Sequence, residues 1–171
     1  MRRVAIIASA SGNGKTTLGR KLARRMGVPF VEVDALVHGP GWTETPDDEL
    51  RRTLEPILAQ DAWVTDQLYL RKVGTLILDH ADTIVWLDLP IRVWLPRLAR
   101  RTGRRITGRE ALWNGNQETV MTAIGGWDSL FVYALRAHFR RRRTWPAKFA
   151  RYPVTRLRST REVERWLAAH S

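Results

Sequence analysis

Near its start the chain reads Ser9-Ala10-Ser11-Gly12-Asn13-Gly14-Lys15-Thr16-Thr17. An apolar run at residues 4–8 precedes this stretch and predicts a β-strand, and Leu18, Leu22 and Met26 mark one face of a helix that follows it. A glycine-rich turn ending in Gly-Lys-Thr between a strand and a helix is typical of a phosphate-binding loop. The backbone N–H groups of such a loop point inward, and the helix N-terminus adds positive potential, so a polyphosphate fits there.

The residues of this loop have distinct expected roles in binding ATP and Mg²⁺. Lys15 is expected to reach the β- and γ-phosphates, and the Thr16 hydroxyl is expected to ligate Mg²⁺. Ser9 stands where the motif has its first glycine, and serine tolerates an unusual backbone angle less well than glycine does. An ordinary strand-to-helix turn without a ligand is the alternative interpretation. The predicted nucleotide-binding residues of the loop are Ser11, Gly12, Asn13, Gly14, Lys15, Thr16 and Thr17.

Length and composition limit the classes of protein that fit. The 171 residues suit one domain spanning residues 1–171, and the absence of cysteine excludes disulfides and thiolate metal sites. No apolar run approaches membrane-spanning length, and no secretory leader is predicted. We therefore expect a cytoplasmic protein with no membrane partner, present as a monomer or a weak dimer.

The chain is strongly basic, with 29 Lys and Arg residues against 17 Asp and Glu and a formal net charge of +12. Almost all of the cations are arginines, whose planar guanidinium suits phosphate groups of nucleotides or nucleic acid. Arginine-rich codon usage and solvated helix faces are the alternative explanation. The run at residues 140–143, beside Trp145 and Tyr152, is one candidate for nucleic-acid binding. Cations at a helix C-terminus are also favourable in themselves, so nucleic acid is the less favoured partner.

Strands are predicted at residues 30–33 and 62–65, and a carboxylate follows each of them. In open α/β sheets, ligands bind beyond the carboxyl ends of the strands. Asp34 follows the first of these strands, where a carboxylate can orient a hydroxyl that attacks a γ-phosphate or accept its proton. Asp66 follows the second, and we expect it to hold Mg²⁺ through water. A capping role for either residue is the alternative.

Arginines gather on a helix predicted from Ile91 onward, which Gly103 is expected to interrupt. Arg97 and Arg101 lie one turn apart on one face, where they could neutralise the charge of a transferring phosphoryl group. Residues 106–126 fit either a flap that closes on substrate or a surface excursion, with a turn at 113–116 and a short helix at 118–124. Further predicted elements are helices at 68–80 and 128–143, strands at 83–87 and 154–157, and a final helix capped by Ser159 and Glu162.

Five ordered motifs give the chain a family resemblance. It resembles the P-loop nucleoside and nucleotide kinases, and among them the small adenylate-kinase-like proteins known as DNA topology modulation proteins. The departures are Ser9 and Gln67, since these kinases usually have glycine at both places. The residues that carry the resemblance are Gly12-Asn13-Gly14-Lys15-Thr16-Thr17, Val33-Asp34-Ala35-Leu36 with Gly39-Pro40-Gly41-Trp42, Trp63-Val64-Thr65-Asp66, Trp86-Leu87-Asp88-Leu89-Pro90 and Leu157-Arg158-Ser159-Thr160-Arg161-Glu162-Val163.

The resemblance implies a three-layer α/β fold with a five-stranded parallel sheet in the order 2-3-1-4-5. It also implies ATP and Mg²⁺ on the loop, an acceptor near Asp34 and Asp66, and Arg158 near the adenine. A lid within residues 97–126 would carry Arg97, Arg100 and Arg101.

These expectations combine into one predicted activity, an ATP-dependent phosphotransferase. Its catalytic residues would be Lys15, Asp34, Arg97 and Arg101, with Thr16 and Asp66 holding the metal and Arg97 and Arg158 contacting the nucleotide. The acceptor would be a small hydroxylated or phosphorylated molecule, with a nucleoside monophosphate as the leading candidate. Two alternatives remain open: a nucleic-acid-associated ATP-binding regulator and an inactive nucleotide-binding module.

Overall fold

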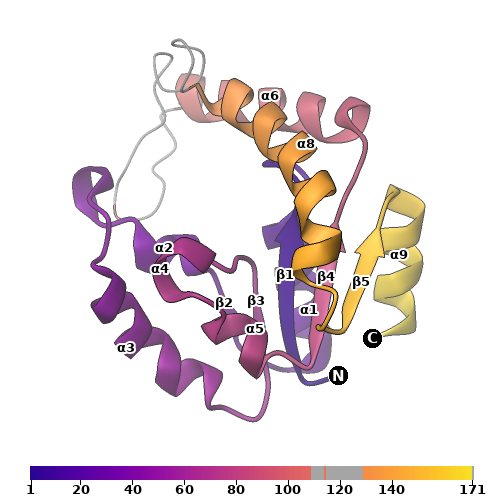
Figure 1. Cartoon of the computed structure of the whole chain (residues 1–171). Coiled ribbons are helices and arrows are strands. Elements are labelled where there is room, and N and C mark those ends of the chain that lie inside the picture. Colours follow the sequence, from indigo (N-terminus) through magenta and orange to yellow (C-terminus); the bar gives the residue numbers. More distant parts are fainter. Residues whose placement is uncertain (109–113, 115–128, 171) are drawn as a thin grey trace.

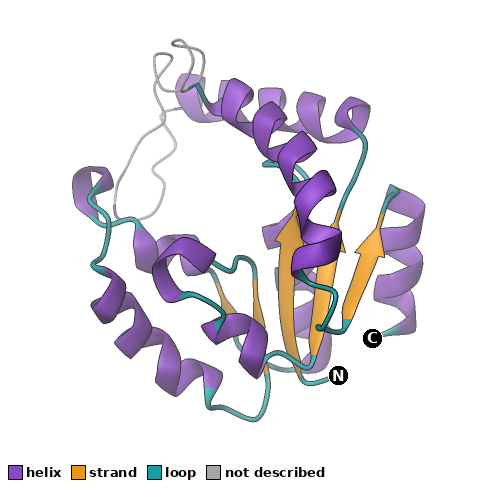
Figure 2. Cartoon of the chain, viewed as in Figure 1, coloured by secondary structure: helices purple, strands orange, loops and turns teal. Residues whose placement is uncertain are grey.

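The computed structural model describes residues 1–108, 114 and 129–170. Its central feature is a five-stranded sheet in the order β2-β3-β1-β4-β5, in which every neighbouring pair is parallel. Figure 2 shows these strands between helices on both sides. The sheet order confirms the one that the resemblance implied. The strands are β1 (Arg3–Ala8), β2 (Phe30–Val31), β3 (Trp63–Thr65), β4 (Thr83–Leu87) and β5 (Val154–Leu157).

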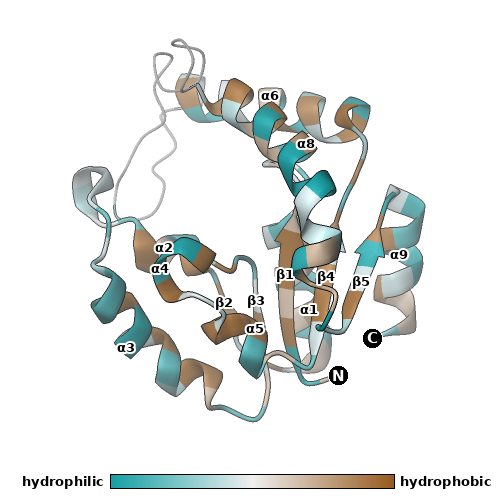
Figure 3. Ribbon diagram, viewed as in Figure 1, coloured by the Kyte–Doolittle hydropathy of each residue, from teal (hydrophilic) through white to brown (hydrophobic). Residues whose placement is uncertain are grey.

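Alternating side chains of β1 build the two cores that flank the sheet. Ala5 and Ile7 face a core that contains leucines of α3 (Asp47–Leu58). Val4, Ile6 and Ala8 face the opposite core, which contains residues of α1 (Lys15–Met26) and α9 (Thr160–Ala169). Both faces of the strand are therefore buried, as a central parallel strand requires, and Figure 3 shows β1 as one of the most hydrophobic elements.

Two long helices, α6 (Ile91–Gly108) and α8 (Leu130–Lys148), lie side by side above the end of the sheet that faces the loop (Figure 1). They share a small core in which Trp94 and Leu98 of α6 contact Ala134 of α8 and Ala10 of the phosphate loop. The loop is therefore packed against both helices. The remaining helices of the described residues are α2 (Val33–Val37), α4 (Leu70–Val73), α5 (Leu76–His80) and a short 3₁₀ turn at Pro40–Trp42.

Several predicted element boundaries were wrong. The helix expected at 68–80 is two helices, because Gly74 adopts φ 61° and ψ −134°, which no helix contains. The strand expected at 30–33 ends at Val31, since Val33 begins α2. Gly103 does not interrupt its helix and lies inside α6. Without a φ requirement or a close neighbour there, glycine is only a mild weakness in a helix.

The helix expected at 128–143 continues to Lys148, so the basic run at 140–143 is not at a helix C-terminus. The helix-dipole explanation of that run is therefore wrong. The last helix begins as predicted, since the Ser159 hydroxyl accepts a hydrogen bond of 3.2 Å from the backbone N–H of Glu162. The turn expected at 113–116, apart from Asn114, and the helix expected at 118–124 lie outside the described residues, as does much of the lid.

Candidate active site

The loop between β1 and α1 has the backbone that its glycines predict. Gly12 and Gly14 adopt φ values of 82° and 91°, in the left-handed region that favours glycine. A Cβ atom at Gly12 would lie only 2.5 Å from the backbone oxygen of Trp94, so α6 approaches the loop too closely for any side chain there. The backbone of Ser9 does not adopt a positive φ, so the difficulty expected at this position does not arise.

Asn13 holds the middle of the loop in shape. Its Nδ2 donates to the backbone oxygen of Ala10 at 2.8 Å, and its Oδ1 accepts from the backbone N–H of Leu89 at 3.0 Å. The Asn13 side chain is buried, and both of its polar ends are thus satisfied. The loop is tied in this way to the turn between β4 and α6.

Thr16 and Asp66 meet at the first turn of α1. The Thr16 hydroxyl donates to Oδ2 of Asp66 at 2.6 Å, and Asp66 is fully buried. Within the part of the chain that the structure describes, Oδ1 of Asp66 has no hydrogen-bond partner. Burial raises the pKa of Asp66, and the Thr16 hydrogen bond and the Lys15 charge oppose that rise. A hydroxyl beside a buried carboxylate oxygen that still needs a partner is a suitable donor pair for Mg²⁺.

Lys15 lies among four other charged side chains. Burial lowers its pKa, the carboxylates of Asp34 and Asp66 act to raise it, and the guanidinium groups of Arg141 and Arg101 lower it again. The structure therefore brings four predicted site residues, Lys15, Asp34, Asp66 and Arg101, to one place. Two anions and three cations converge where the loop would receive a polyphosphate.

Arg141 is a member of this group that the sequence interpretation missed. Its Nη1 donates to the backbone oxygen of Ala8 at 2.9 Å, and its guanidinium lies 5.1 Å from the centroid of the Trp145 ring. Helical periodicity could have revealed its direction, because the buried residues of α8, Ala134, His138 and Trp145, fall on the same face. Arg140, Arg142 and Arg143 of the same run are exposed.

Asp34 lies in the first turn of α2 rather than at the end of a strand. The Tyr69 hydroxyl donates to Oδ1 of Asp34 at 2.5 Å and lies 3.2 Å from Nε2 of His38. Burial and the charge of Asp34 raise the pKa of Tyr69, so the phenol stays protonated and acts as a donor. Asn114, between α6 and α8 in sequence, reaches this side of the site, where its Nδ2 donates to the backbone oxygen of His38 at 2.6 Å.

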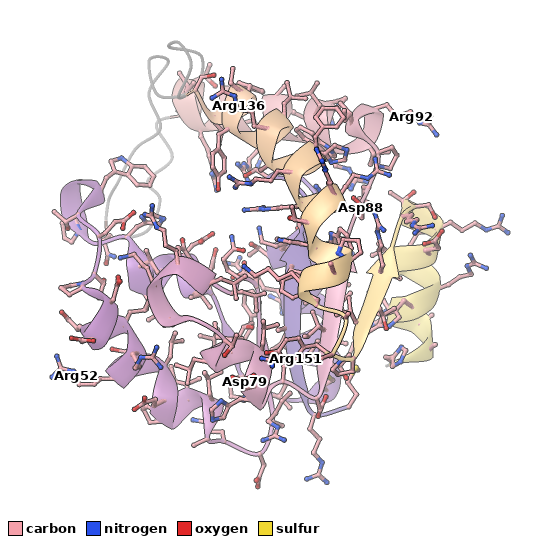
Figure 4. The ribbon with its side chains drawn as sticks, in the orientation of Figure 1. Arg52, Asp79, Asp88, Arg92, Arg136 and Arg151 are labelled. Atoms are coloured by element: carbon pink, nitrogen blue, oxygen red, sulfur yellow. The ribbon has the colours of Figure 1, made fainter. Side chains whose placement is uncertain are left out.

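Two predicted arginines of the site, Arg97 and Arg158, are exposed. Arg97 lies on α6 one turn before the half-buried Arg101. Arg158 follows β5, and its backbone N–H donates to Oε2 of Glu162 at 2.7 Å. Their contacts with a nucleotide stay predictions. Other arginines, such as Arg52 and Arg92, point away from the body of the protein (Figure 4) and account for part of the basic charge.

The structure resembles solved kinases over nearly its whole length. It matches shikimate kinase from Acinetobacter baumannii, solved in complex with shikimate, with a TM-score of 0.59 and 16% identity over 99% of this chain and 90% of that one. It matches a gluconokinase from Sinorhizobium meliloti with a TM-score of 0.54 and 18% identity over 98% and 92% of the two chains. The fold is that of the P-loop kinases of small molecules.

The sequence comparisons point the same way. The chain is 29% identical over 137 residues to a shikimate kinase from Novosphingobium aromaticivorans, which covers 71% of this chain and 70% of that protein. A shikimate kinase from Gloeobacter violaceus is also 29% identical, over 55% of this chain and 60% of that protein. No protein-family model matches the chain. The resemblance to DNA topology modulation proteins is not confirmed by these relatives.

Among the described residues, no helix has the length and apolar character needed to cross a bilayer.

Proposed function

We propose that this chain is an ATP-dependent kinase that phosphorylates a hydroxyl group of a small, non-nucleotide acceptor. The observation that carries this proposal is the hydrogen bond of 2.6 Å between Thr16 and Asp66 at the phosphate loop, next to Lys15, on whose charge Asp34 also acts. A loop with this backbone offers N–H groups to the phosphates of ATP, and Lys15 adds a charge beside them. Asp34 supplies a carboxylate on the side that an acceptor would approach.

The transfer step follows from these positions. Asp34 orients the acceptor hydroxyl and takes its proton as the hydroxyl oxygen bonds to the γ-phosphorus. The bond between that phosphorus and the β–γ bridging oxygen breaks, and ADP leaves. Lys15, Arg101 and Arg141 offset the negative charge of the transferring group. Thr16 and Asp66 would hold Mg²⁺, which neutralises charge on the phosphate oxygens.

The acceptor we propose is a polyhydroxylated carboxylic acid. The kinases that this chain resembles are named for shikimate and gluconate, and both molecules combine several hydroxyl groups with one carboxylate. The side chains around Asp34 are polar, with the Tyr69 and His38 groups within hydrogen-bonding distance of each other. A nucleoside monophosphate, the acceptor expected from the sequence, has no support from these relatives.

The decisive experiment is a screen for ADP release with ATP and Mg²⁺. The panel contains shikimate, gluconate and other hydroxy acids, together with the common nucleoside monophosphates. We expect turnover with a hydroxy acid that depends on Mg²⁺ and disappears in Lys15→Met. Turnover with nucleoside monophosphates alone would reject the proposal. So would a rate of ADP release that no acceptor raises above the rate measured without an acceptor.

The nucleic-acid alternative loses part of its basis once the basic run is located. Arg141 donates to the backbone oxygen of Ala8, and Arg142, although exposed, is paired with the buried Asp88, so Arg140 and Arg143 are the exposed cations of the run outside these two contacts. Binding of duplex DNA at about 0.15 M salt, with a steep salt dependence, would restore this alternative.

A further inference from the structure

Ser9 replaces the first glycine of the phosphate loop and takes part in a buried hydrogen-bond network. Its hydroxyl donates to Oδ1 of Asp88 at 2.5 Å and accepts from Nε1 of Trp86 at 2.9 Å. All three residues are almost fully buried. A glycine at this position would offer neither the donor nor the acceptor.

Asp88 connects this hydroxyl to two arginines from distant parts of the chain. Its Oδ2 accepts from Nε and Nη2 of Arg156 on β5, at 3.0 and 2.6 Å. The same oxygen lies 3.3 Å from Nε of Arg142 on α8. Figure 4 shows Asp88 where β4 ends, close to α8 and β5. A buried carboxylate is tolerated when it is paired and hydrogen-bonded in this way.

The network contacts Ala8 and Ser9, where β1 ends and the phosphate loop begins. Arg142 reaches Ser9 through Asp88, and its neighbour Arg141 donates directly to the backbone oxygen of Ala8. Two consecutive arginines of α8 therefore hold two consecutive residues at the start of the loop, Arg141 by a direct hydrogen bond to Ala8 and Arg142 through Asp88 to Ser9. Arg141 is also one of the charges that act on Lys15, so the same contacts fix a cation of the site.

We propose that Ser9 and Asp88 are positioning residues for nucleotide binding. Together with Trp86, Arg142 and Arg156 they set the path of the phosphate loop and keep Arg141 beside Lys15. Ser9 thus has a positive role here and is not a tolerated loss of the usual glycine. This inference rests on the proposed function, because its effect is measured on ATP.

The test compares Ser9→Gly and Ser9→Ala with the wild-type chain in calorimetric titrations with ATP and Mg²⁺, without an acceptor. We expect the Kd for ATP to rise about tenfold in both variants, because each removes both hydrogen bonds of the Ser9 hydroxyl. The matched control is Tyr152→Phe, which removes a hydrogen bond of 2.8 Å to Asp79 at the other end of β5. Its stability should fall while its Kd for ATP stays that of the wild type.

A second variant tests the pairing itself. Asp88→Asn should weaken ATP binding in the wild-type background, and this effect should be much smaller once Ser9 is glycine, because linked residues are not additive. Wild-type affinity in Ser9→Gly and Ser9→Ala, or additive effects of Ser9→Gly and Asp88→Asn, would overturn the positioning role. Absence of ATP binding by the wild-type chain would instead overturn the proposed function, and the positioning role with it.

Discussion

The Thr16 hydroxyl lies 2.6 Å from Oδ2 of Asp66, which ties the first turn of α1 to the residue that follows β3. The parallel pairing of β1 with β3 brings these two residues together although 50 positions separate them. The second oxygen of Asp66 is buried without a hydrogen-bond partner among the described residues. Such an atom is unfavourable in a folded protein unless a ligand satisfies it.

Asp66 should therefore control the metal requirement. In Asp66→Asn we expect the Mg²⁺ concentration for half-maximal activity to rise about 10- to 100-fold, because the ion loses a charged partner. The measurement is a Mg²⁺ titration of ATP turnover. Thr16→Ser, which keeps the hydroxyl, is the control and should stay near the wild type. An unchanged Mg²⁺ requirement in Asp66→Asn would remove this residue from the metal site.

Asp34 should control the chemical step. Asp34→Asn keeps the shape but cannot accept a proton, so kcat should fall about 10²- to 10⁴-fold while the Kd for ATP changes little. Tyr69→Phe removes the hydrogen bond to Asp34 and the contact with His38 but leaves the carboxylate in place, so it should have a much smaller effect. Steady-state kinetics of both variants provide the comparison. Equal losses in the two, or full activity in Asp34→Asn, would contradict the assigned role of the carboxylate.

Arg141 and Arg140 are neighbours in sequence with opposite surroundings, and they form a matched pair. Arg141→Gln removes a cation that acts on Lys15, and kcat should fall about 10²-fold or more, as when other transition-state donors are lost. Arg140→Gln removes an exposed arginine and should leave turnover unchanged. Equal kcat values for the two variants in the same assay would show that Arg141 does not contribute to turnover.

His138 should make the stability of the fold sensitive to acid. Burial lowers the pKa of His138 from its ordinary 6.5, the nearby Arg142 charge lowers it further, and Asp88 partly opposes them. The unfolded chain thus takes up a proton at a higher pH than the folded chain does. Stability that is present above pH 6.5 should be lost progressively as the pH falls below that value.

Denaturant unfolding at several pH values between about 7 and 5, the range in which histidine titrates, measures this effect. His138→Gln keeps an acceptor for the Arg142 guanidinium, which lies 3.3 Å from Nε2 of the histidine. The variant should lose stability less steeply with acid than the wild type does. Parallel curves for the two proteins would show that His138 does not contribute to the acid sensitivity.

The sequence predicted the phosphate loop and the strands well because their signals are local. The run at residues 4–8 and the Gly-Lys-Thr turn specify β1, the loop and α1 without help from the rest of the chain. Asp66 lies beside Thr16 because neighbouring parallel strands end at one edge of the sheet, while its role in holding the metal stays a prediction. The sheet order came from the resemblance, and the pattern of residues alone would not have supplied it.

The contacts that shape the site were harder to predict because they join distant residues. Ser9 and Asp88 are separated by 79 positions, and nothing in either local pattern indicates the other. Tyr69 adopts φ 46°, which is uncommon for a residue with a side chain and is imposed by its surroundings. Its contact with Asp34 was hidden because the segment was interpreted as one continuous helix.

The loop from Ser9 to Thr17 is proposed to bind the phosphates of ATP, and direct titration tests this binding most simply. We expect the wild-type chain to bind ATP with Mg²⁺, and Lys15→Met, folded as judged by circular dichroism, to bind at least about tenfold more weakly through loss of a charge-assisted contact. No ATP binding by the wild-type chain, or equal affinity in Lys15→Met, would contradict the account.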